Sequence, residues 1–305
     1  MARRLRIQFE GALYHVINRG NFRRDVFETT GAAKAFEATL GETCERHNWR
    51  VHAYVIMRNH YHVALETPDG HLGEGMHWLQ STYASRFNRF RGVRGHLFQG
   101  RYQALVLEDA AALVRVANYI HLNPVRASLV AASQVALFRW SSLPRFTRSP
   151  RASWLVWTDL LSRFGLTDSA QGWSEYMRYL IQLAGDAREQ ERQEFPRLEI
   201  GWAIGTAGWR QALAQTYSHR ALEQGIDRSE LREIKETRWR NALDHALVAS
   251  GKTAADVAED AKGAHWKIRI AQRLRRQFAA PHRWIAEHLN MGTPEAVRVN
   301  VARLR

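Results

Sequence analysis

Two histidines separated by a single residue are the first candidates for chemistry in this chain. His60 and His62 flank Tyr61, in a pattern that predicts strands over residues 49–56 and 61–65. Because side chains alternate along a strand, both imidazoles would lie on one face and could bind one divalent ion. Two polar residues on the open face of a half-buried sheet would give the same pattern, and an isolated His-x-His favours that simpler reading.

A tyrosine and an asparagine further along form the second candidate pair. Residues 109–123 are predicted to form a helix that Asp109 caps and Pro124 stops. Tyr119 and Asn123 are four residues apart, so they lie on one helix face about one turn from each other. A tyrosine hydroxyl can attack a phosphodiester, and an asparagine carbonyl can complete a metal shell begun by two histidines. Taken alone, a core aromatic and a helix C-cap explain the pair better.

Taken together, the two stretches resemble the Y1 tyrosine nucleases of the IS200/IS605 transposase superfamily, and in particular the REP-associated tyrosine transposases. The resemblance covers roughly the first half of the chain and, more loosely, its C-terminal end. No departure removes a catalytic residue of the family. In family order, the motifs that carry it are Tyr14–Asn21, His60-Tyr61-His62, Phe98–Tyr102 and Tyr119–Arg126.

The resemblance implies a specific reaction. Tyr119 would attack a single-stranded DNA phosphate, forming a 5′-phosphotyrosine and releasing a 3′-hydroxyl. His60, His62 and Asn123 would hold a divalent ion, Mg²⁺ or Mn²⁺. Because imidazoles suit softer ions than Mg²⁺, we expect Mn²⁺ to bind more tightly, with Mg²⁺ as the ion used in the cell. The implied substrate is an imperfect palindrome folded as a hairpin with a short guide sequence at its foot.

Composition points to a polyanionic partner. The chain has 305 residues, 45% of them hydrophobic, a formal net charge of +14 and a pI of about 10.5. Such a basic balance favours nucleic acid first and an anionic membrane second. The sequence has no apolar run near 18 residues and no signal-peptide pattern, and Cys44 is its single cysteine. We therefore expect no membrane partner and a location in the cytoplasm, at the bacterial nucleoid.

The order of elements predicts the fold class. Strand, helix, strand, strand, helix, strand is the pattern of a ferredoxin-like antiparallel sheet, so we expect an α+β chain whose nuclease domain is followed by all-α segments. Proline, serine and threonine over residues 138–150 suggest a linker. Residues 154 to about 192 are expected to be helical, with a second helix that carries Trp173, Tyr176, Tyr179 and Leu180. The predicted domains are a nuclease domain over 1–140, a linker and helical spacer over 141–228, and a C-terminal DNA-binding domain over 229–305.

Basic residues mark the expected DNA contacts. Three arginines surround the turn after the first predicted strand, where solvated loop charges are an equally good explanation. A basic helix over residues 267–278 precedes two short helices, 281–289 and 294–304, which are predicted to form a helix-turn-helix whose second helix enters the major groove. A plain helical hairpin with a basic surface is the alternative. The candidate DNA-binding residues are Arg19, Arg23, Arg24, Arg101, Lys267, Arg269, Arg273, Arg298 and Arg303.

The function predicted from these observations is a metal-dependent tyrosine transposase that cleaves and rejoins single-stranded or hairpin DNA, with a monomer favoured. The alternative is a catalytically silent, sequence-specific DNA-binding regulator, against which the intact Tyr119, His60, His62 and Asn123 argue. A third possibility is a metal-dependent phosphohydrolase that uses water, whose activity would survive the loss of Tyr119, whereas that of the transposase would not. A relaxase or rolling-circle initiator has similar chemistry but usually arranges the tyrosine motif differently.

Overall fold

The computed structural model describes residues 7–223, 230–278 and 280–303. The chain forms two compact units that divide between residues 210 and 211. We call residues 7–210 the sheet unit and residues 211–303 the helical unit. Residues 141–210, which follow the nuclease domain predicted from the sequence, lie in the sheet unit. None of the described helices is long and apolar enough to cross a membrane.

The sheet unit is built on a mostly antiparallel sheet with the order β2-β3-β1-β4-β5. Its first four strands and two long helices follow one another in the predicted ferredoxin-like order of strand, helix, strand, strand, helix, strand. Only the short β5 runs parallel to its neighbour, β4. This arrangement confirms the α+β class. The strands are β1 (Ala12–Arg19), β2 (Arg50–Ile56), β3 (His60–Thr67), β4 (Gln103–Leu107) and β5 (Ala203–Ile204).

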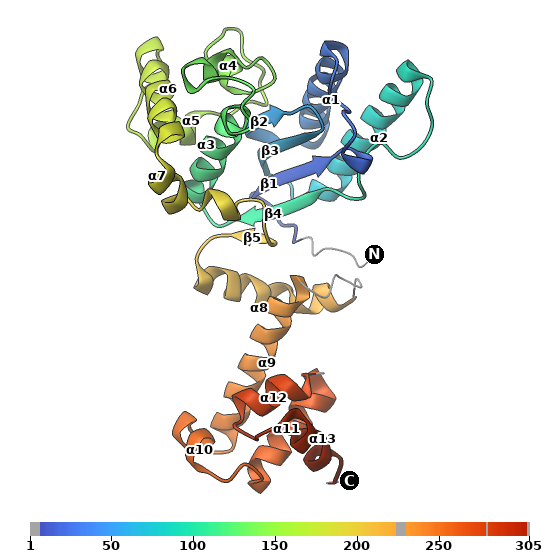
Figure 1. Ribbon diagram of the computed structural model, residues 1–305, viewed down its shortest axis with the longest axis vertical. Helices are drawn as coiled ribbons and strands as arrows, with labels where there is room; N and C mark the ends of the chain where they lie inside the picture. Colours follow the sequence, from blue (N-terminus) through green and yellow to red (C-terminus); the bar gives the residue numbers. More distant parts are fainter. Residues whose placement is uncertain (1–6, 224–229, 279, 304–305) are drawn as a thin grey trace. The chain divides into compact units, whose positions relative to one another are not determined.

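Two long helices, α1 (Thr30–His47) and α2 (Leu72–Arg91), cover one face of the sheet (Figure 1). Phe36 of α1 and Tyr83 of α2 have ring centroids 5.1 Å apart, and Phe36 lies 4.6 Å from the ring of Tyr61 on β3. The strand alternation therefore sends Tyr61 into this aromatic core. The flanking histidines must then face the opposite side of the sheet.

Helix α3 (Ala110–Arg126) packs on that opposite face, mainly against β2 and β3. The Asp109 side chain caps the helix by accepting a hydrogen bond from the backbone N–H of Ala112 at 2.8 Å. Pro124 does not stop the helix as predicted, because α3 continues to Arg126. The proline stands in the last turn, where its missing N–H removes only one hydrogen bond of the ladder.

The stretch expected to be a linker, residues 138–150, packs instead against β2. Ser142 Oγ accepts a hydrogen bond from the backbone N–H of Tyr54 at 3.0 Å, and Leu143 and Phe146 are buried. The stretch over 154–192, expected to form two helices, forms three. The elements of this part are η2 (Ala132–Leu137), α4 (Leu143–Phe146), α5 (Thr158–Ser162), α6 (Ala170–Gly185), α7 (Ala187–Arg192) and η3 (Phe195–Arg197).

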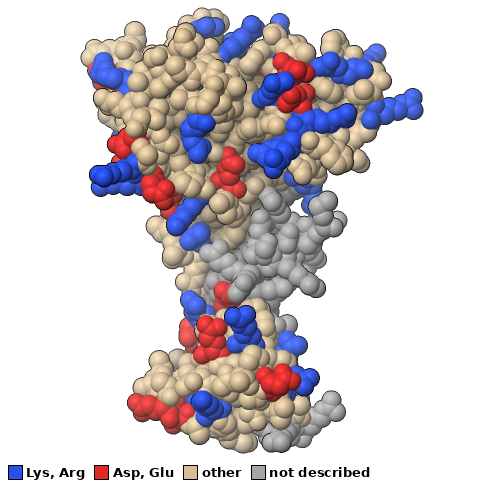
Figure 2. Space-filling view, in the orientation of Figure 1, with Lys and Arg blue, Asp and Glu red and all other residues tan. Residues whose placement is uncertain are grey.

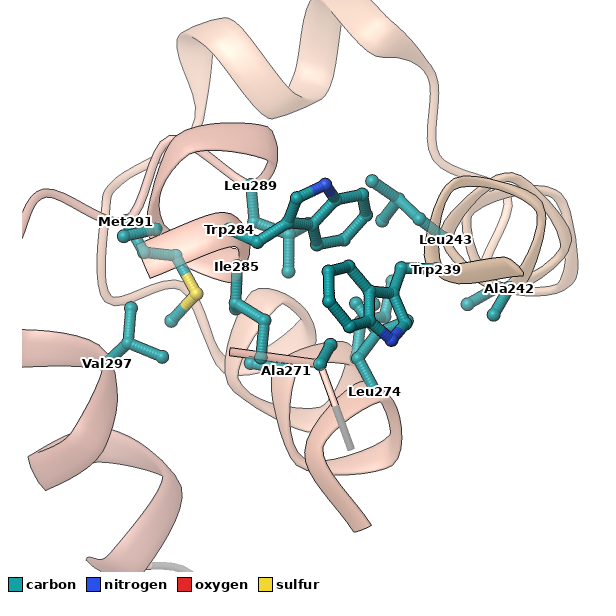
Figure 3. Packing of buried hydrophobic residues seen from close by; sticks show 14 residues of the cluster. Trp239, Ala242, Leu243, Ala271, Leu274, Trp284, Ile285, Leu289, Met291 and Val297 are labelled. Carbon is teal, nitrogen blue, oxygen red and sulfur yellow. The ribbon is translucent and has the colours of Figure 1, made fainter. Parts of the chain in front are cut away.

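The helical unit has its own hydrophobic core, which contains Trp239 and Trp284 (Figure 3). The ring centroids of these two side chains are 5.6 Å apart. Leu274, Ile285 and Leu289 pack around them. Most of α8 and all of the following helices belong to this unit. The helices are α8 (Ala207–Glu223), α9 (Glu230–Ala249), α10 (Ala254–Glu259), α11 (His265–Phe278), α12 (His282–His288) and α13 (Pro294–Arg303).

Gly75 of α2 lets this helix pack closely against Trp49, which lies between α1 and β2. A Cβ added to Gly75 would lie 2.2 Å from Cζ2 of the buried Trp49 ring, whereas a Cβ on Gly31 of α1 would meet no atom within 4 Å. Gly75→Ala should therefore destabilise the protein by about 1–3 kcal/mol through overpacking. Gly31→Ala should be neutral or stabilising by up to about 1 kcal/mol, since alanine favours the helix. Denaturant unfolding measures both, and equal effects would contradict this packing account.

Candidate active site

The two histidines predicted to act together do lie on one face of β3, an inner strand of the sheet. The ring centroids of His60 and His62 are 5.1 Å apart. His62 is completely buried, while His60 stands at the end of the strand and is partly exposed. Because β3 is paired on both sides, by β1 and β2, the backbone holds both side chains in fixed positions.

Helix α3 places the tyrosine and the asparagine against the same imidazole. The ring centroids of Tyr119 and His62 are 5.8 Å apart, and Nδ2 of Asn123 lies 3.4 Å from Nε2 of His62. The four-residue spacing within one helix thus puts both residues at one point, as the sequence predicted. All of these residues come from a single chain, so the cluster needs no second copy.

A hydrogen-bonded chain fixes the tautomer of His62. His15 on β1 is buried, and its Nδ1 lies 2.8 Å from the carbonyl oxygen of Leu198, which can only accept. A neutral His15 must therefore donate from Nδ1, which leaves its Nε2 as an acceptor. That Nε2 lies 3.1 Å from Nδ1 of His62, so His62 donates from Nδ1 and its Nε2 is unprotonated. The nitrogen that faces Asn123 is thus the one able to bind a cation.

Burial keeps these imidazoles neutral. Desolvation lowers the pKa of His15 to about 4 and, helped by the Arg19 charge, lowers the pKa of His60 to about 4. The pKa of His62 falls well below its usual value, first through burial and then through the neighbouring His15 and His60. Neutral imidazole is the form that binds metal ions, so near neutral pH the three rings are in the state that a metal site requires.

Glu199 and Arg126 complete the surroundings of Tyr119. The Tyr119 hydroxyl donates a short hydrogen bond to Oε1 of Glu199, and the same oxygen lies 3.7 Å from Nε2 of His62. The Arg126 guanidinium carbon lies 4.6 Å from the centre of the Tyr119 ring. Burial and, after it, the Glu199 carboxylate raise the pKa of Tyr119, so the phenol is protonated in this arrangement.

Sequence reasoning did not single out Glu199 or assign a role to Arg126. Glu199 lies 80 residues after Tyr119, in the stretch between η3 and β5, and no local pattern links the two. Arg126 could have been noticed, because it lies seven residues after Tyr119 and therefore near the same helix face. Phe195 also packs edge-on against Tyr119, with ring centroids 5.4 Å apart. Tyr119 is only 4% exposed, so this cover must move before a large ligand can contact its hydroxyl.

The donor set fits a divalent metal ion. His60 Nδ1 is hydrogen bonded to Oδ1 of Asn59 at 2.7 Å, and His62 Nδ1 is bonded to His15, so each ring has its outer nitrogen occupied and Nε2 left for a ligand. Among the described residues, no three His, Cys, Asp or Glu side chains already form a metal-binding group. A third ligand would therefore come from the Asn123 amide oxygen or from a small movement of Glu199.

Of the arginines predicted near the sheet, Arg19 and the loop that carries Arg23 and Arg24 lie beside His60. Arg19 pairs with His60 in the sheet register, and Arg23 and Arg24 are exposed in the loop that follows β1. Arg101 is exposed just before β4. Figure 2 shows Lys and Arg side chains gathered over the side of the sheet unit that carries α1 and α2.

In the helical unit, one predicted DNA contact is wrong. Lys267 is completely buried, and its Nζ donates hydrogen bonds to the carbonyl oxygens of Val257 and Asp260 at 2.9 and 2.7 Å. An ammonium so engaged cannot reach a phosphate, and burial lowers its pKa. The sequence pattern missed this because it counted basic residues along the helix without separating its two faces.

The other predicted residues of the helical unit remain available. Arg269 and Arg273 are exposed on α11, and Arg298 is exposed on α13, where it also pairs with Glu295. The side chain of Arg303 lies outside the described residues. Helices α12 and α13 are joined by a tight turn, but a helix-turn-helix that reads DNA stays a prediction.

Comparison with known proteins finds a matching family model. Residues 8–123, which include His60, His62, Tyr119 and Asn123, match the family model described as "Transposase IS200 like". Over this segment, which is less than half of the chain, the protein is similar to the IS200-like transposase family. No curated protein matches the chain.

Two solved structures are similar to the chain at low identity. One is described as a REP-associated tyrosine transposase bound to a REP hairpin; it is 18% identical, covers 48% of this chain and 84% of its own, and has a TM-score of 0.41. The other, a candidate transposase from Deinococcus radiodurans R1, is 17% identical, covers 42% of this chain and 92% of its own, and has a TM-score of 0.29.

The buried position of Lys267 leads to a test on α11. Lys267→Met should destabilise the helical unit by about 1–3 kcal/mol, because two buried carbonyls lose their donor. Arg269→Ala, on the exposed face of the same helix, should leave stability within about 0.5 kcal/mol of the wild type. Thermal unfolding measures both variants, and an unchanged stability for Lys267→Met would contradict the structural role.

Proposed function

We propose that this protein is a metal-dependent tyrosine transposase that cleaves and rejoins single-stranded or hairpin DNA through a 5′-phosphotyrosine intermediate. The observation that carries the proposal is the meeting of Tyr119, Asn123 and the unprotonated Nε2 of His62 at one buried point, within the segment that matches IS200-like transposases. A plain DNA-binding regulator would have no use for a neutral imidazole pair beside a tyrosine hydroxyl.

The cleavage step needs a nucleophile, a proton acceptor and a counter-charge. In the proposed reaction Oη of Tyr119 attacks phosphorus, the P–O3′ bond breaks, and the released oxygen takes a proton to become a 3′-hydroxyl. Glu199 Oε1, which already accepts the Tyr119 hydrogen bond, is the nearest group that can take the phenolic proton. Arg126 lies over the same ring and supplies positive charge for the phosphate.

The histidines and the asparagine hold the cation. Bound by His60, His62 and Asn123, a Mg²⁺ or Mn²⁺ ion would polarise a phosphate oxygen and stabilise the charge that develops on it. His15 keeps the proton of His62 on Nδ1, so that Nε2 stays free for the ion. For Asn123 to contribute its oxygen, the amide must turn so that Oδ1 takes the place of Nδ2.

The covalent link makes transfer possible. A phosphotyrosine conserves the energy of the phosphodiester, so attack by another 3′-hydroxyl reverses the step and joins new strand ends. Hairpin DNA is the proposed substrate, and one of the similar structures is described as bound to a REP hairpin. The helical unit would bind the duplex stem through the exposed Arg269, Arg273 and Arg298.

The nucleophile is tested by removing one oxygen atom. Tyr119→Phe should abolish strand cleavage and the covalent adduct while DNA affinity and stability change little, because only the hydroxyl is lost. Denaturing gels of labelled hairpin DNA with Mn²⁺ measure both products. Cleavage that persists at the normal rate in this variant would instead identify a nuclease that uses water.

The metal site is tested by direct binding of Mn²⁺ without DNA. His60→Ala and His62→Ala should each remove most Mn²⁺ binding in calorimetric titrations, whereas Asn123→Ala should do less harm because water can replace a neutral oxygen ligand. His15→Leu should weaken binding roughly 10- to 100-fold, as loss of an outer-shell partner does. His15→Gln, which keeps an acceptor for His62 Nδ1 and a donor for Leu198, is the matched control. Cleavage that continues unchanged in excess EDTA would refute the metal role.

A further inference from the structure

A phenylalanine stands exposed in the loop that follows β1. The loop spans residues 20–24 and includes the short helix η1 (Asn21–Arg23). Phe22 is 86% exposed and has φ 53° and ψ 28°, and Arg23 also has a positive φ of 58°. A bulky residue in the left-handed region is unfavourable, and so is an apolar ring in water. Neither feature helps the chain to fold.

The loop is nevertheless held in one shape. Gly20 donates its backbone N–H to the carbonyl oxygen of Asn59 at 2.7 Å, and the Asn59 side chain donates to the carbonyl oxygen of Arg23 at 3.3 Å. A Cβ on Gly20 would lie 2.3 Å from the carbonyl oxygen of Arg24, so only glycine allows the turn to close this tightly. The surrounding structure therefore presents the Phe22 ring in advance of any ligand.

The loop adjoins the proposed active site. Arg19, the last residue of β1, pairs with His60 in the sheet, and Gly20 is bonded to Asn59, the residue before His60. A DNA strand whose phosphate lies at His60 and His62 would thus pass this loop within a few nucleotides.

The charges around the ring suit a polyanion. Arg23 and Arg24, which follow Phe22 in the loop, are exposed, and neither forms an ion pair with another described residue. The nearest acids in sequence, Asp25 and Glu28, are both paired with Arg58, at 2.9 and 3.2 Å. Positive charge beside the ring is therefore not neutralised by the protein.

We infer that Phe22 is a stacking platform for an unpaired DNA base next to the cleavage site, with Arg23 and Arg24 holding the flanking phosphates. A phenyl ring recognises the face of a base, which is available in a single strand and hidden in a duplex. Aromatic rings among arginines are the usual way in which proteins bind single strands without reading sequence. This inference rests on the proposed function, since it takes the strand to run past His60.

The test is a double-mutant cycle of DNA affinities, in which a substitution in the protein is combined with a change in the DNA. The protein variants are Phe22→Ala, Phe22→Trp and the control Phe90→Ala. Phe90 is also strongly exposed, at 81%, but it lies in the last turn of α2, which covers the opposite face of the sheet. Each full-length variant is titrated with a hairpin that carries a single-stranded extension, and with versions in which one extension base at a time is abasic.

Phe22→Ala should weaken binding roughly 5- to 150-fold, the range that stacking of one base supplies, while Phe22→Trp keeps the affinity. At one extension position, an abasic site should erase the difference between the wild type and Phe22→Ala. Equal affinities for the wild type and Phe22→Ala would overturn the inference, as would a loss that no abasic site removes or an equal loss in Phe90→Ala. Melting temperatures confirm that the variants are folded.

The proposed function is judged separately in the same samples. At saturating DNA, Phe22→Ala should still form the Tyr119 adduct, because the loop contributes affinity and not the nucleophile. An adduct without the abasic effect refutes the stacking platform alone. A wild type that forms no adduct at all refutes the proposed reaction, whatever Phe22 does.

Discussion

The complete burial of the His62 ring is the constraint on which the candidate site depends. An imidazole enclosed in this way must have both nitrogens accounted for. His15 occupies Nδ1, and Asn123 together with Glu199 surrounds Nε2. Strands β1 and β3, helix α3 and the stretch after η3 therefore meet at one ring. Moving any one of them would leave a buried polar atom without a partner, so the fold and the site specify each other.

The enclosure of His62 also depends on residues that follow the segment matched by the family model, 8–123. The match to IS200-like transposases ends at residue 123, yet the carbonyl of Leu198 orients His15 and the carboxylate of Glu199 holds Tyr119. The intervening helices pack on α3 and bring this stretch back to the sheet, where β5 pairs with β4. In the proposed reaction the downstream segment thus acts as the wall of the active site and not as a spacer.

The sequence predicted what depends on local periodicity. Alternation along β3 predicted that His60 and His62 share one face, and the four-residue spacing on α3 predicted the same for Tyr119 and Asn123. The expectation that the two pairs act together came from the family resemblance, and the order of elements predicted the ferredoxin-like sheet. The sequence could not predict that Glu199 contacts Tyr119, because this contact depends on long-range packing. It misread residues 138–150, whose turn-forming residues are buried against β2. Lys267 shows the limit of counting charges, since a lysine can serve the core as a hydrogen-bond donor to backbone carbonyls.

The most direct measurement is to locate the covalent bond between protein and DNA. Wild-type protein is incubated with labelled hairpin DNA and Mn²⁺, digested, and the peptide that carries the nucleotide is sequenced by mass spectrometry. The chain contains nine tyrosines, so the position of the link is informative. The account predicts a phosphodiester at Tyr119 and at no other residue, with a free 3′-hydroxyl on the released strand. A link at a different tyrosine, or cleaved DNA with no protein attached, would contradict it.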